Sequence, residues 1–372
     1  MDPPPWYPAL VRRRRVEPGQ REPGSSWLLG CLRLTVVVLL AAATVGCTGQ
    51  PPATTSSGEP SLGIQIPVPQ PFRVAAGEGS AWVLSRGPMP CSPAQPCTVS
   101  RIDPGSNRLV GTPTRLPADG WDLAVGAGSV WATQFDGRLV RIDARTGRIR
   151  ARISARPIYF GSVVTFGGGF VWTGNDDERN HSGSVSKIDP ATNHVVGNLA
   201  GLGSPQSIAF GQGAVWVADH AGWLVKIDPA RLTVLARRRL DFGPHGVVVT
   251  PRAVYVADAH GGRLLQVDPE TAKVQRVVEL SPGPITPVVG AGWIWSSSAE
   301  AWGGTTKDNR VLRIDPVTLR IVQVLQLGGN VPSVGFGFGS VWVPVGTSSV
   351  VVRIAPTARN GSPPDPRSEE PP

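Results

Sequence analysis

The chain has 372 residues, of which 41% are hydrophobic, and its 12 tryptophans supply enough apolar surface for a folded core, which excludes a disordered chain. Its 45 glycines and 38 prolines, with only 17% charged residues, favour many short strands and turns over long helices. The net charge of +9 permits nucleic-acid binding, but charge alone does not establish that function.

An export signal is predicted at the N-terminus. Four arginines at 12–15 precede an uncharged run at 34–45, which is as long as a signal-peptide core and short for a membrane-spanning helix. The run ends in Thr-Val-Gly-Cys47, which resembles a bacterial lipobox, where a peptidase cuts before a cysteine that becomes lipid-modified. We therefore expect a signal peptide over 1–46 and lipidation of Cys47. The alternative is an uncleaved membrane anchor over 27–45.

Both alternatives predict a tethered protein on the outer side of the cell membrane, because acyl chains and apolar helices each hold a chain at a bilayer. Residues 47–61 are a Pro/Ser/Thr-rich spacer with nothing to bury, and residues 357–372 are a Pro-rich tail that we expect to be disordered.

Cys91 and Cys97 are the two cysteines that remain beside Cys31 of the signal peptide and the lipidation site Cys47. In an oxidising compartment, two cysteines this close are predicted to form a disulfide, which would stabilise the fold by about 2 kcal/mol on the chain-entropy model. The rival interpretation is a metal-binding pair, but no second Cys/His pair at zinc-like spacing accompanies it.

Two linked landmarks recur seven times along the chain and decide the predicted fold. Each copy holds four short apolar runs, as at 207–210, 214–218, 223–227 and 233–238 in the fourth copy. Glycine turns and Asp-Pro turns separate the runs, so each copy predicts a four-stranded antiparallel meander. The first landmark, G-x-G-x-V-W, lies at 77–82, 126–131, 167–172, 211–216, 250–255 (degenerate), 290–295 and 337–342; the second, I-D-P or a close variant, lies at 102–104, 142–144, 188–190, 227–229, 267–269, 314–316 and 354–356.

Periods of about 40 residues with four strands each indicate a β-propeller, in which neighbouring sheets bury each other's faces. The repeated Trp or Tyr is expected on the second strand, packed between blades. The seventh copy lacks a fourth strand, and residues 63–68 (GIQIPV) read like one. We therefore predict an all-β, seven-bladed propeller over 62–356 whose last blade is closed by the N-terminal strand.

These repeats resemble the YVTN family of seven-bladed propellers and the related streptogramin (virginiamycin) B lyases. The resemblance covers about residues 62–356 and is specific for the fold. The lyases carry a Trp-Phe-Thr-Glu type strand, whereas the matching segments here, 216–219 and 255–258, end in Asp. The catalytic residues of the lyases are therefore not transferred to this chain.

The loops between second and third strands, and those between blades, share one face and vary in length, which is typical of a binding face. His220, His245 and His260 fall on these loops, beside Asp219 and Asp258. Such a set can act as a general base or hold a divalent metal. The alternative is that they are ordinary solvated loop residues.

Aromatic residues on the same face suit a sugar or peptide ligand, although they can equally pack beneath the loops. The candidates are Trp121, Tyr159 and Phe160 between blades, with Glu300 and Trp302 in the long loop of the sixth copy.

Two functions follow. The first is a tethered binding or scaffold module for a protein, peptide or sugar, without catalysis or a cofactor. Nucleic acid is not expected as a ligand, because charged outer strands are ordinary protection of sheet edges. The second is a lyase- or hydrolase-type enzyme that works through His220, His245 and His260, either without a metal or assisted by Mg²⁺.

Overall fold

The computed structural model describes residues 63–87, 90–154, 160–177, 182–281, 283–299 and 310–357. The chain divides into two units, 1–57 and 58–372, and every described residue belongs to the second. The predicted signal peptide, Cys47, the spacer and all but the first residue of the tail lie outside the described residues. Among the residues that the structure describes, no helix is long and apolar enough to cross a membrane.

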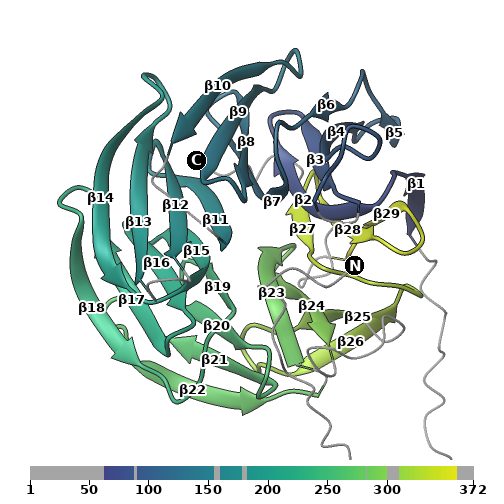
Figure 1. Cartoon of the computed structure of the whole chain (residues 1–372). Coiled ribbons are helices and arrows are strands. Elements are labelled where there is room, and N and C mark those ends of the chain that lie inside the picture. Colours follow the sequence, from purple (N-terminus) through teal and green to yellow (C-terminus); the bar gives the residue numbers. More distant parts are fainter. Residues whose placement is uncertain are drawn as a thin grey trace, which may run out of the picture. The chain divides into compact units, whose positions relative to one another are not determined.

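The described residues form seven antiparallel sheets arranged around a centre (Figure 1), which confirms the predicted all-β propeller. Blade 1 departs from the others, because its outer edge consists of two short strands that both pair with β4. The strands are, for blade 1, β2 (Pro71–Gly77), β3 (Ser80–Ser85), β4 (Thr98–Asp103), β5 (Arg108–Leu109) and β6 (Thr114–Arg115); for blade 2, β7 (Gly120–Gly126), β8 (Ser129–Gln134), β9 (Arg138–Asp143) and β10 (Ile149–Ser154); for blade 3, β11 (Phe160–Gly167), β12 (Phe170–Asp177), β13 (Ser182–Asp189) and β14 (His194–Leu202); for blade 4, β15 (Pro205–Gly211), β16 (Ala214–Asp219), β17 (Trp223–Asp228) and β18 (Thr233–Arg239); for blade 5, β19 (Gly246–Val249), β20 (Val254–Asp258), β21 (Arg263–Val267) and β22 (Val274–Glu279); for blade 6, β23 (Gly283–Gly290), β24 (Trp293–Ala299), β25 (Arg310–Ile314) and β26 (Ile321–Gln326); and for blade 7, β27 (Gly335–Gly337), β28 (Ser340–Val345), β29 (Val350–Ile354) and β1 (Ile64–Pro67).

The glycine landmark makes the tight turn between the first and second strands of a blade. In blade 1, Glu78 has φ 51° and Gly79 has φ 73°, and both central residues of a type I′ hairpin need a positive φ. The same turn occurs at Ala127 and Gly128 in blade 2. Glycine at the second position removes the Cβ clash that this backbone would otherwise impose.

The N-terminal strand closes the last blade, as predicted. β1 pairs antiparallel with β29, and Ile64 lies opposite Arg353 while Pro67 lies opposite Val350. The inner strands also contact one another in a complete circle, in the order β2, β7, β11, β15, β19, β23, β27 and back to β2. Blade 7 thus joins both ends of the described chain, beside blade 1 (Figure 1).

Seven apolar clusters form the core, one at each interface between blades, and each contains one landmark aromatic side chain. Trp131 of blade 2 packs with Val164 and Val171 of blade 3, and Tyr255 of blade 5 packs with Ile294 and Leu312 of blade 6. The prediction that the second-strand aromatics lie between blades is confirmed. Their exposed fractions are between 0% and 3% (Trp82, Trp131, Trp172, Trp216, Tyr255, Trp295 and Trp342).

Lysine and arginine side chains on the third strands link several blades to the next blade. Lys226 of β17 lies 5.4 Å from the Trp216 ring and donates to the Pro269 carbonyl of blade 5 at 2.7 Å. Arg141 makes the equivalent pair of contacts with the Trp131 ring and the Pro190 carbonyl. The charge of these third-strand residues therefore joins neighbouring blades.

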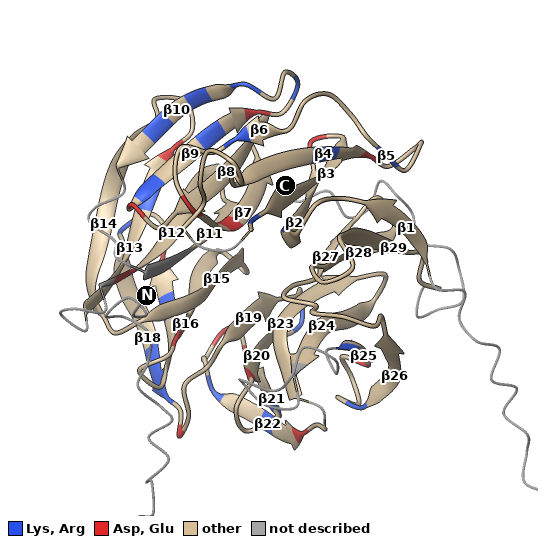
Figure 2. Cartoon of the chain, turned by 45° about the vertical axis from the view of Figure 1, so that its right-hand side comes forward, with Lys and Arg blue, Asp and Glu red and all other residues tan. Residues whose placement is uncertain are grey.

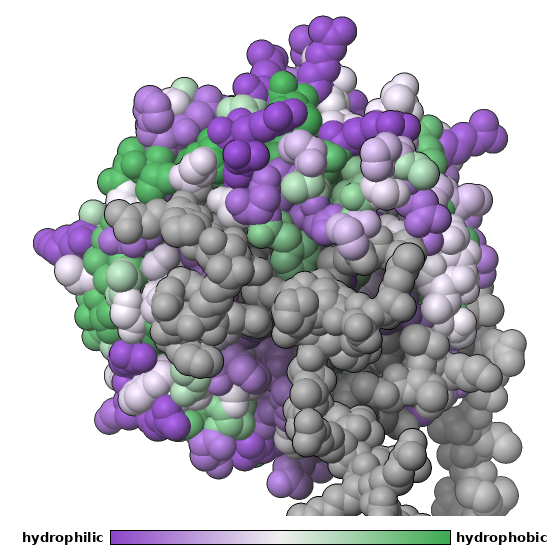
Figure 3. Space-filling view, in the orientation of Figure 1, coloured by the Kyte–Doolittle hydropathy of each residue, from purple (hydrophilic) through white to green (hydrophobic). Residues whose placement is uncertain are grey.

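The outer strands carry much of the surface charge. Figure 2 shows Lys and Arg along β10 and β18, the fourth strands of blades 2 and 4. Apolar side chains are interleaved with them, including Leu235 at 54% exposed and Val277 at 53%, and apolar surface is visible at the periphery in Figure 3.

Candidate ligand-binding mouth

One face of the ring, called the mouth from here on, is defined by the loops between second and third strands and by the loops between blades. His220 follows β16 and His260 follows β20, both on loops of the first kind, whereas His245 directly precedes β19 on a loop of the second kind. Because antiparallel strands alternate in direction, the end of each second strand and the start of each first strand lie at the same face of the ring.

The three candidate histidines lie together at the junction of blades 4 and 5. The ring centroids of His220 and His245 are 4.7 Å apart, those of His245 and His260 are 4.6 Å apart, and those of His220 and His260 are 6.0 Å apart. His245 is 9% exposed, while His220 and His260 are exposed. The mouth thus has a buried imidazole flanked by two imidazoles that reach solvent.

The two aspartates predicted beside the histidines hold the loops in place. Asp219 is fully buried, and its carboxylate accepts the amides of Gly203 at 2.9 Å and Ser204 at 2.7 Å. Asp258 is also fully buried; it accepts the His260 amide at 3.2 Å and Arg263 Nε at 2.8 Å. We therefore assign both carboxylates to positioning the histidine loops, and no ligand contact is proposed for them.

A glycine makes room for the His220 ring. A Cβ atom at Gly243 would lie 2.5 Å from His220 Nδ1 and 2.7 Å from the His220 carbonyl oxygen. Real Cβ atoms do not approach other heavy atoms so closely, so only glycine at 243 allows the loop before β19 to pass beside His220.

The buried histidine of the cluster, His245, is uncharged near neutral pH. Burial lowers the pKa of His245 to about 4, and the neighbouring His220 and His260 lower it further as like charges. The pKa of His220 is also lowered, first by partial desolvation of its ring and then by the like charge of His260. Neutral imidazoles can accept a proton or ligate a metal.

The donors at this cluster do not fit Mg²⁺, which prefers oxygen ligands, because the carboxylate of Asp219 accepts the Ser204 and Ala221 amides and that of Asp258 accepts Arg263 Nε. Within the described ranges, one group of three potential ligands has its donor atoms within 4.8 Å of one another, and it consists of Cys91, Cys97 and Asp119. The two sulfurs of that group are already joined to each other in a disulfide, so they do not offer thiolates to a metal.

Across the ring, blades 1 and 2 present an arginine–aromatic group, defined as Phe72, Arg73, Arg86, Trp121 and Phe135. The Trp121 ring lies 5.7 Å from the Phe72 ring and 5.2 Å from the Phe135 ring. All five side chains are half-buried. The predicted binding residue Trp121 is thus part of an aromatic surface, with Arg86 Cζ 4.9 Å and Arg73 Cζ 5.7 Å from its ring centroid.

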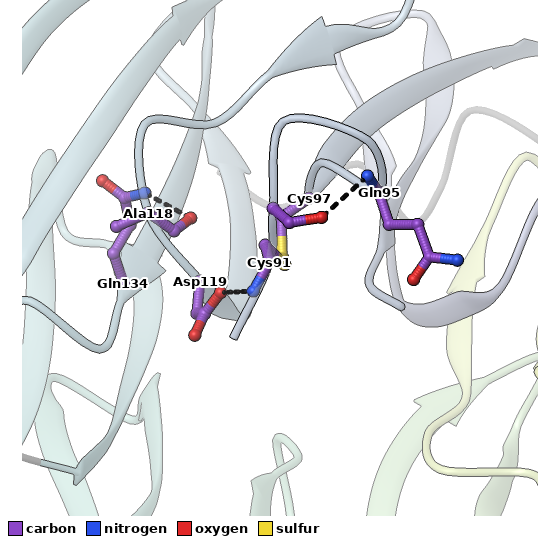
Figure 4. The surroundings of a disulfide bond; sticks show 7 residues. Cys91, Gln95, Cys97, Ala118, Asp119 and Gln134 are labelled. Atoms are coloured by element: carbon purple, nitrogen blue, oxygen red, sulfur yellow. Dashed lines mark hydrogen bonds between the residues drawn. A yellow bond between two sulfur atoms is a disulfide. The ribbon is translucent and has the colours of Figure 1, made fainter. Parts of the chain in front are cut away.

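A disulfide between Cys91 and Cys97 clips the loop of blade 1 next to this group, with the two Cα atoms 5.6 Å apart. Asp119, which lies two residues before Trp121, accepts the Cys91 amide at 2.5 Å (Figure 4). Gln134 donates to the Ala118 carbonyl at 2.7 Å in the same view. The blade 1 loop and the segment leading into β7 are therefore fixed to each other beside Trp121.

Of the remaining candidates, only Phe160 lies within the described residues, and its backbone is at the mouth end of the first strand of blade 3. Tyr159, Glu300 and Trp302 lie outside the described residues. Phe160 begins β11 and lies opposite Asp176 of β12. Four further members of the arginine–aromatic group were not predicted. Phe72, Arg86 and Phe135 stand at strand ends like Trp121, which is a signal that sequence inspection could have used, whereas Arg73 is the third residue of β2.

Comparison with known proteins adds no assignment. No protein-family model matches the chain, and a search of curated proteins found no match.

Proposed function

We propose that the chain is a membrane-tethered, extracytoplasmic binding module of the YVTN propeller type that takes a sugar or peptide ligand at its mouth, without catalysis. The observation that carries this proposal is the half-buried aromatic surface of Phe72, Trp121 and Phe135 on rigid strand ends. Aromatic side chains that converge with a few polar groups on a concave face are typical of small-ligand sites.

An array of neutral oligosaccharides, acidic oligosaccharides and short peptides tests the binding proposal with the full chain. The wild type should retain a subset of the array, and Trp121→Ala should lose it. Trp293→Ala is the matched control, because Trp293 is also half-buried but begins β24 at the opposite face. Equal loss in both variants, or no retention by the wild type, would contradict a site at the mouth.

The tether is supported by the sequence alone, through the apolar run at 34–45 and Cys47 after it. A Cys47→Ser variant should lose a metabolically incorporated acyl label and keep its signal peptide. Cys31→Ser is the control, since Cys31 precedes the apolar run. Unchanged labelling of Cys47→Ser would rule out this attachment site.

A second candidate function is a lyase- or hydrolase-type activity, and the histidine cluster favours it. A neutral imidazole can remove a proton from a bound substrate as a general base. His220 is the imidazole suited to that role, because it is exposed and its pKa is lowered, so it is unprotonated at neutral pH. The buried His245, whose ring centroid is 4.7 Å from that of His220, would orient the His220 ring.

Incubation of the full chain with each ligand retained on the array tests for catalysis. An enzyme would convert the ligand, and His220→Ala would abolish the conversion while leaving binding intact. His194→Ala is the control, because His194 is an exposed histidine on the outer strand β14. Retention of unchanged ligand by the wild type would eliminate the enzyme hypothesis.

A further inference from the structure

A run of arginines lies at the outer rim of blade 2. Arg145 and Arg148 lie in the turn between β9 and β10, and Arg150 and Arg152 lie in β10. All four residues are exposed, and Figure 2 shows the basic residues along this rim. These four residues are called the basic edge from here on.

Acidic residues compensate little of the charge of the basic edge. Asp143 Oδ2 lies 2.6 Å from Arg150 Nη2 and also accepts Arg150 Nε at 3.0 Å. Within the described ranges, the side chains of Arg145, Arg148 and Arg152 form no ion pair. Residues 144–155 contain neither Asp nor Glu. The basic edge therefore keeps most of its positive charge.

Protection of a sheet edge does not account for this run of one sign. Charge of either sign can keep an outer strand from pairing with another chain. The equivalent outer strands β14 and β26 contain no Lys, Arg, Asp or Glu. The ring thus leaves other outer strands without charge but collects arginine on β10, and a surface of that kind attracts an anionic partner.

The described chain begins on the same face of the ring as the basic edge. The turns between first and second strands and those between third and fourth strands lie opposite the mouth, on a face called the turn face below. Gly63 precedes β1, the fourth strand of blade 7, so the segment that follows Cys47 enters the ring at the turn face. Arg145 and Arg148 lie in a turn of that face.

Two side chains connect this entry point to the basic edge. Arg353, which lies opposite Ile64 of β1, donates to Asn107 Oδ1 in the turn of blade 1 at 2.7 Å. Arg101 of blade 1 donates from Nη1 to the Arg145 carbonyl of blade 2 at 3.5 Å. The entry point and the turns of blades 1 and 2 are therefore consecutive on the turn face.

We infer that the basic edge docks on anionic lipid headgroups of the membrane to which the chain is tethered, so that the mouth faces away from the bilayer. The inference rests on the proposed tether at Cys47. Residues 48–62 span at most about 55 Å when fully extended, so the tether keeps the turn face within reach of the bilayer. Each Arg near an anionic bilayer strengthens binding about fivefold.

Flotation of the full chain with lipid vesicles tests this docking surface. Vesicles of phosphatidylcholine alone are compared with vesicles of equal parts phosphatidylcholine and phosphatidylglycerol, and the measured quantity is the ratio of the two partition coefficients. The apolar run at 34–45 and the arginines at 12–15 are present in every variant, so their contribution to the ratio is constant.

A triple variant with Arg145→Gln, Arg148→Gln and Arg152→Gln should lower this ratio at least about tenfold, and added salt should reduce the difference from the wild type. The triple variant Arg145→Lys, Arg148→Lys and Arg152→Lys should keep the wild-type ratio, because docking on a bilayer depends on charge and not on the guanidinium group. A fall in the Lys variant as large as in the Gln variant would contradict docking by charge.

The matched control combines Arg138→Gln, Arg237→Gln and Arg239→Gln. These three arginines are also exposed, and their loss removes the same charge from the mouth ends of β9 and β18. The ratio of this control should stay within about twofold of the wild-type ratio.

Equal ratios in the wild type and the Gln variant of the basic edge, or an equal fall in the mouth control, would overturn the inference. Retention of double-stranded DNA that the Gln variant loses, without any preference for anionic vesicles, would overturn it in favour of nucleic acid. The tether fails separately, through unchanged acyl labelling of Cys47→Ser, because the comparison between vesicle types does not measure acylation.

Discussion

Arg353 of the last blade donates a hydrogen bond from Nη1 to Asn107 Oδ1 of the first blade at 2.7 Å. The same guanidinium lies 4.9 Å from the Trp342 ring and also donates to the Pro104 carbonyl. One side chain therefore joins blade 7, in which the ring closes, to blade 1. Hydrogen bonds from charged groups contribute more to stability than neutral ones, so this contact should contribute measurably to the free energy of unfolding of the closed ring.

Arg353→Met should lower the free energy of unfolding by about 1–3 kcal/mol, because the neighbouring oxygens lose a charged donor while the apolar stem is kept. Denaturant unfolding followed by tryptophan fluorescence gives the value. Arg150→Met is the control: Arg150 pairs with Asp143 at 2.6 Å but is 58% exposed, so its loss should cost less than about 1 kcal/mol. Equal losses of unfolding free energy in the two variants would contradict a larger contribution from the Arg353 contact.

The N-terminal strand should contribute strongly to stability through Ile66, which is 2% exposed and packs with Trp342 and Val74. Ile66→Ala should destabilise the ring by about 2–5 kcal/mol through lost burial and the cavity that remains. Ile64→Ala, in the same strand but 52% exposed, should change the free energy of unfolding by less than about 0.5 kcal/mol. Similar effects for the two variants would contradict the pairing of β1 with β29.

The landmark tryptophans should not be equally sensitive to loss of the indole N–H. Trp131 Nε1 donates to the Gly126 carbonyl at 3.0 Å. Trp216 Nε1 is buried and has no acceptor within the described part of the chain. Trp131→Phe should therefore cost about 1 kcal/mol more than Trp216→Phe, measured by denaturant unfolding, since only the first substitution removes a hydrogen bond. A larger cost for Trp216→Phe would be the opposite of this expectation.

The buried His245 should make stability depend on pH in a defined window. Its folded-state pKa of about 4 lies below the usual value, so between about pH 6.5 and pH 4 the unfolded chain takes up a proton that the folded chain does not. The free energy of unfolding should therefore fall as the pH falls through this window, by about 3 kcal/mol in total, and this loss should not continue below about pH 4. Above about pH 6.5 the group contributes no pH dependence.

His245→Asn should flatten that window, and subtracting its pH profile from the wild-type profile isolates the contribution of this histidine from those of the carboxylates. An identical pH dependence in the two proteins would mean that His245 titrates normally.

Much of the fold was predictable because it is repeated. Seven copies of a glycine turn and an Asp-Pro turn set the strand bounds, and the missing fourth strand of the last copy indicated where residues 63–68 belong. The split outer edge of blade 1 was not predictable, because β5 and β6 lack the regular apolar alternation of the other fourth strands.

The mouth was only partly predictable. His220, His245 and His260 could be assigned to one face from strand direction, since each stands at the end of a recognisable strand. Arg86 could be assigned to the same face in the same way, since it directly follows β3, but the contact with Trp121 that it shares with Arg73 arises only when blades 1 and 2 pack together. The roles of Asp219 and Asp258 depended on backbone amides of their loops, which side-chain identity does not reveal.

The central claim about the mouth is that loops of one face bring His220, His245 and His260 together. NMR of the full chain with labelled histidine tests it directly, because the sequence has only five histidines. We expect cross-relaxation between the His220 and His245 rings, whose centroids are 4.7 Å apart, and its loss in Gly243→Ala with the His194 signal unchanged. A His245 ring with no cross-relaxation to either His220 or His260 would contradict the claim.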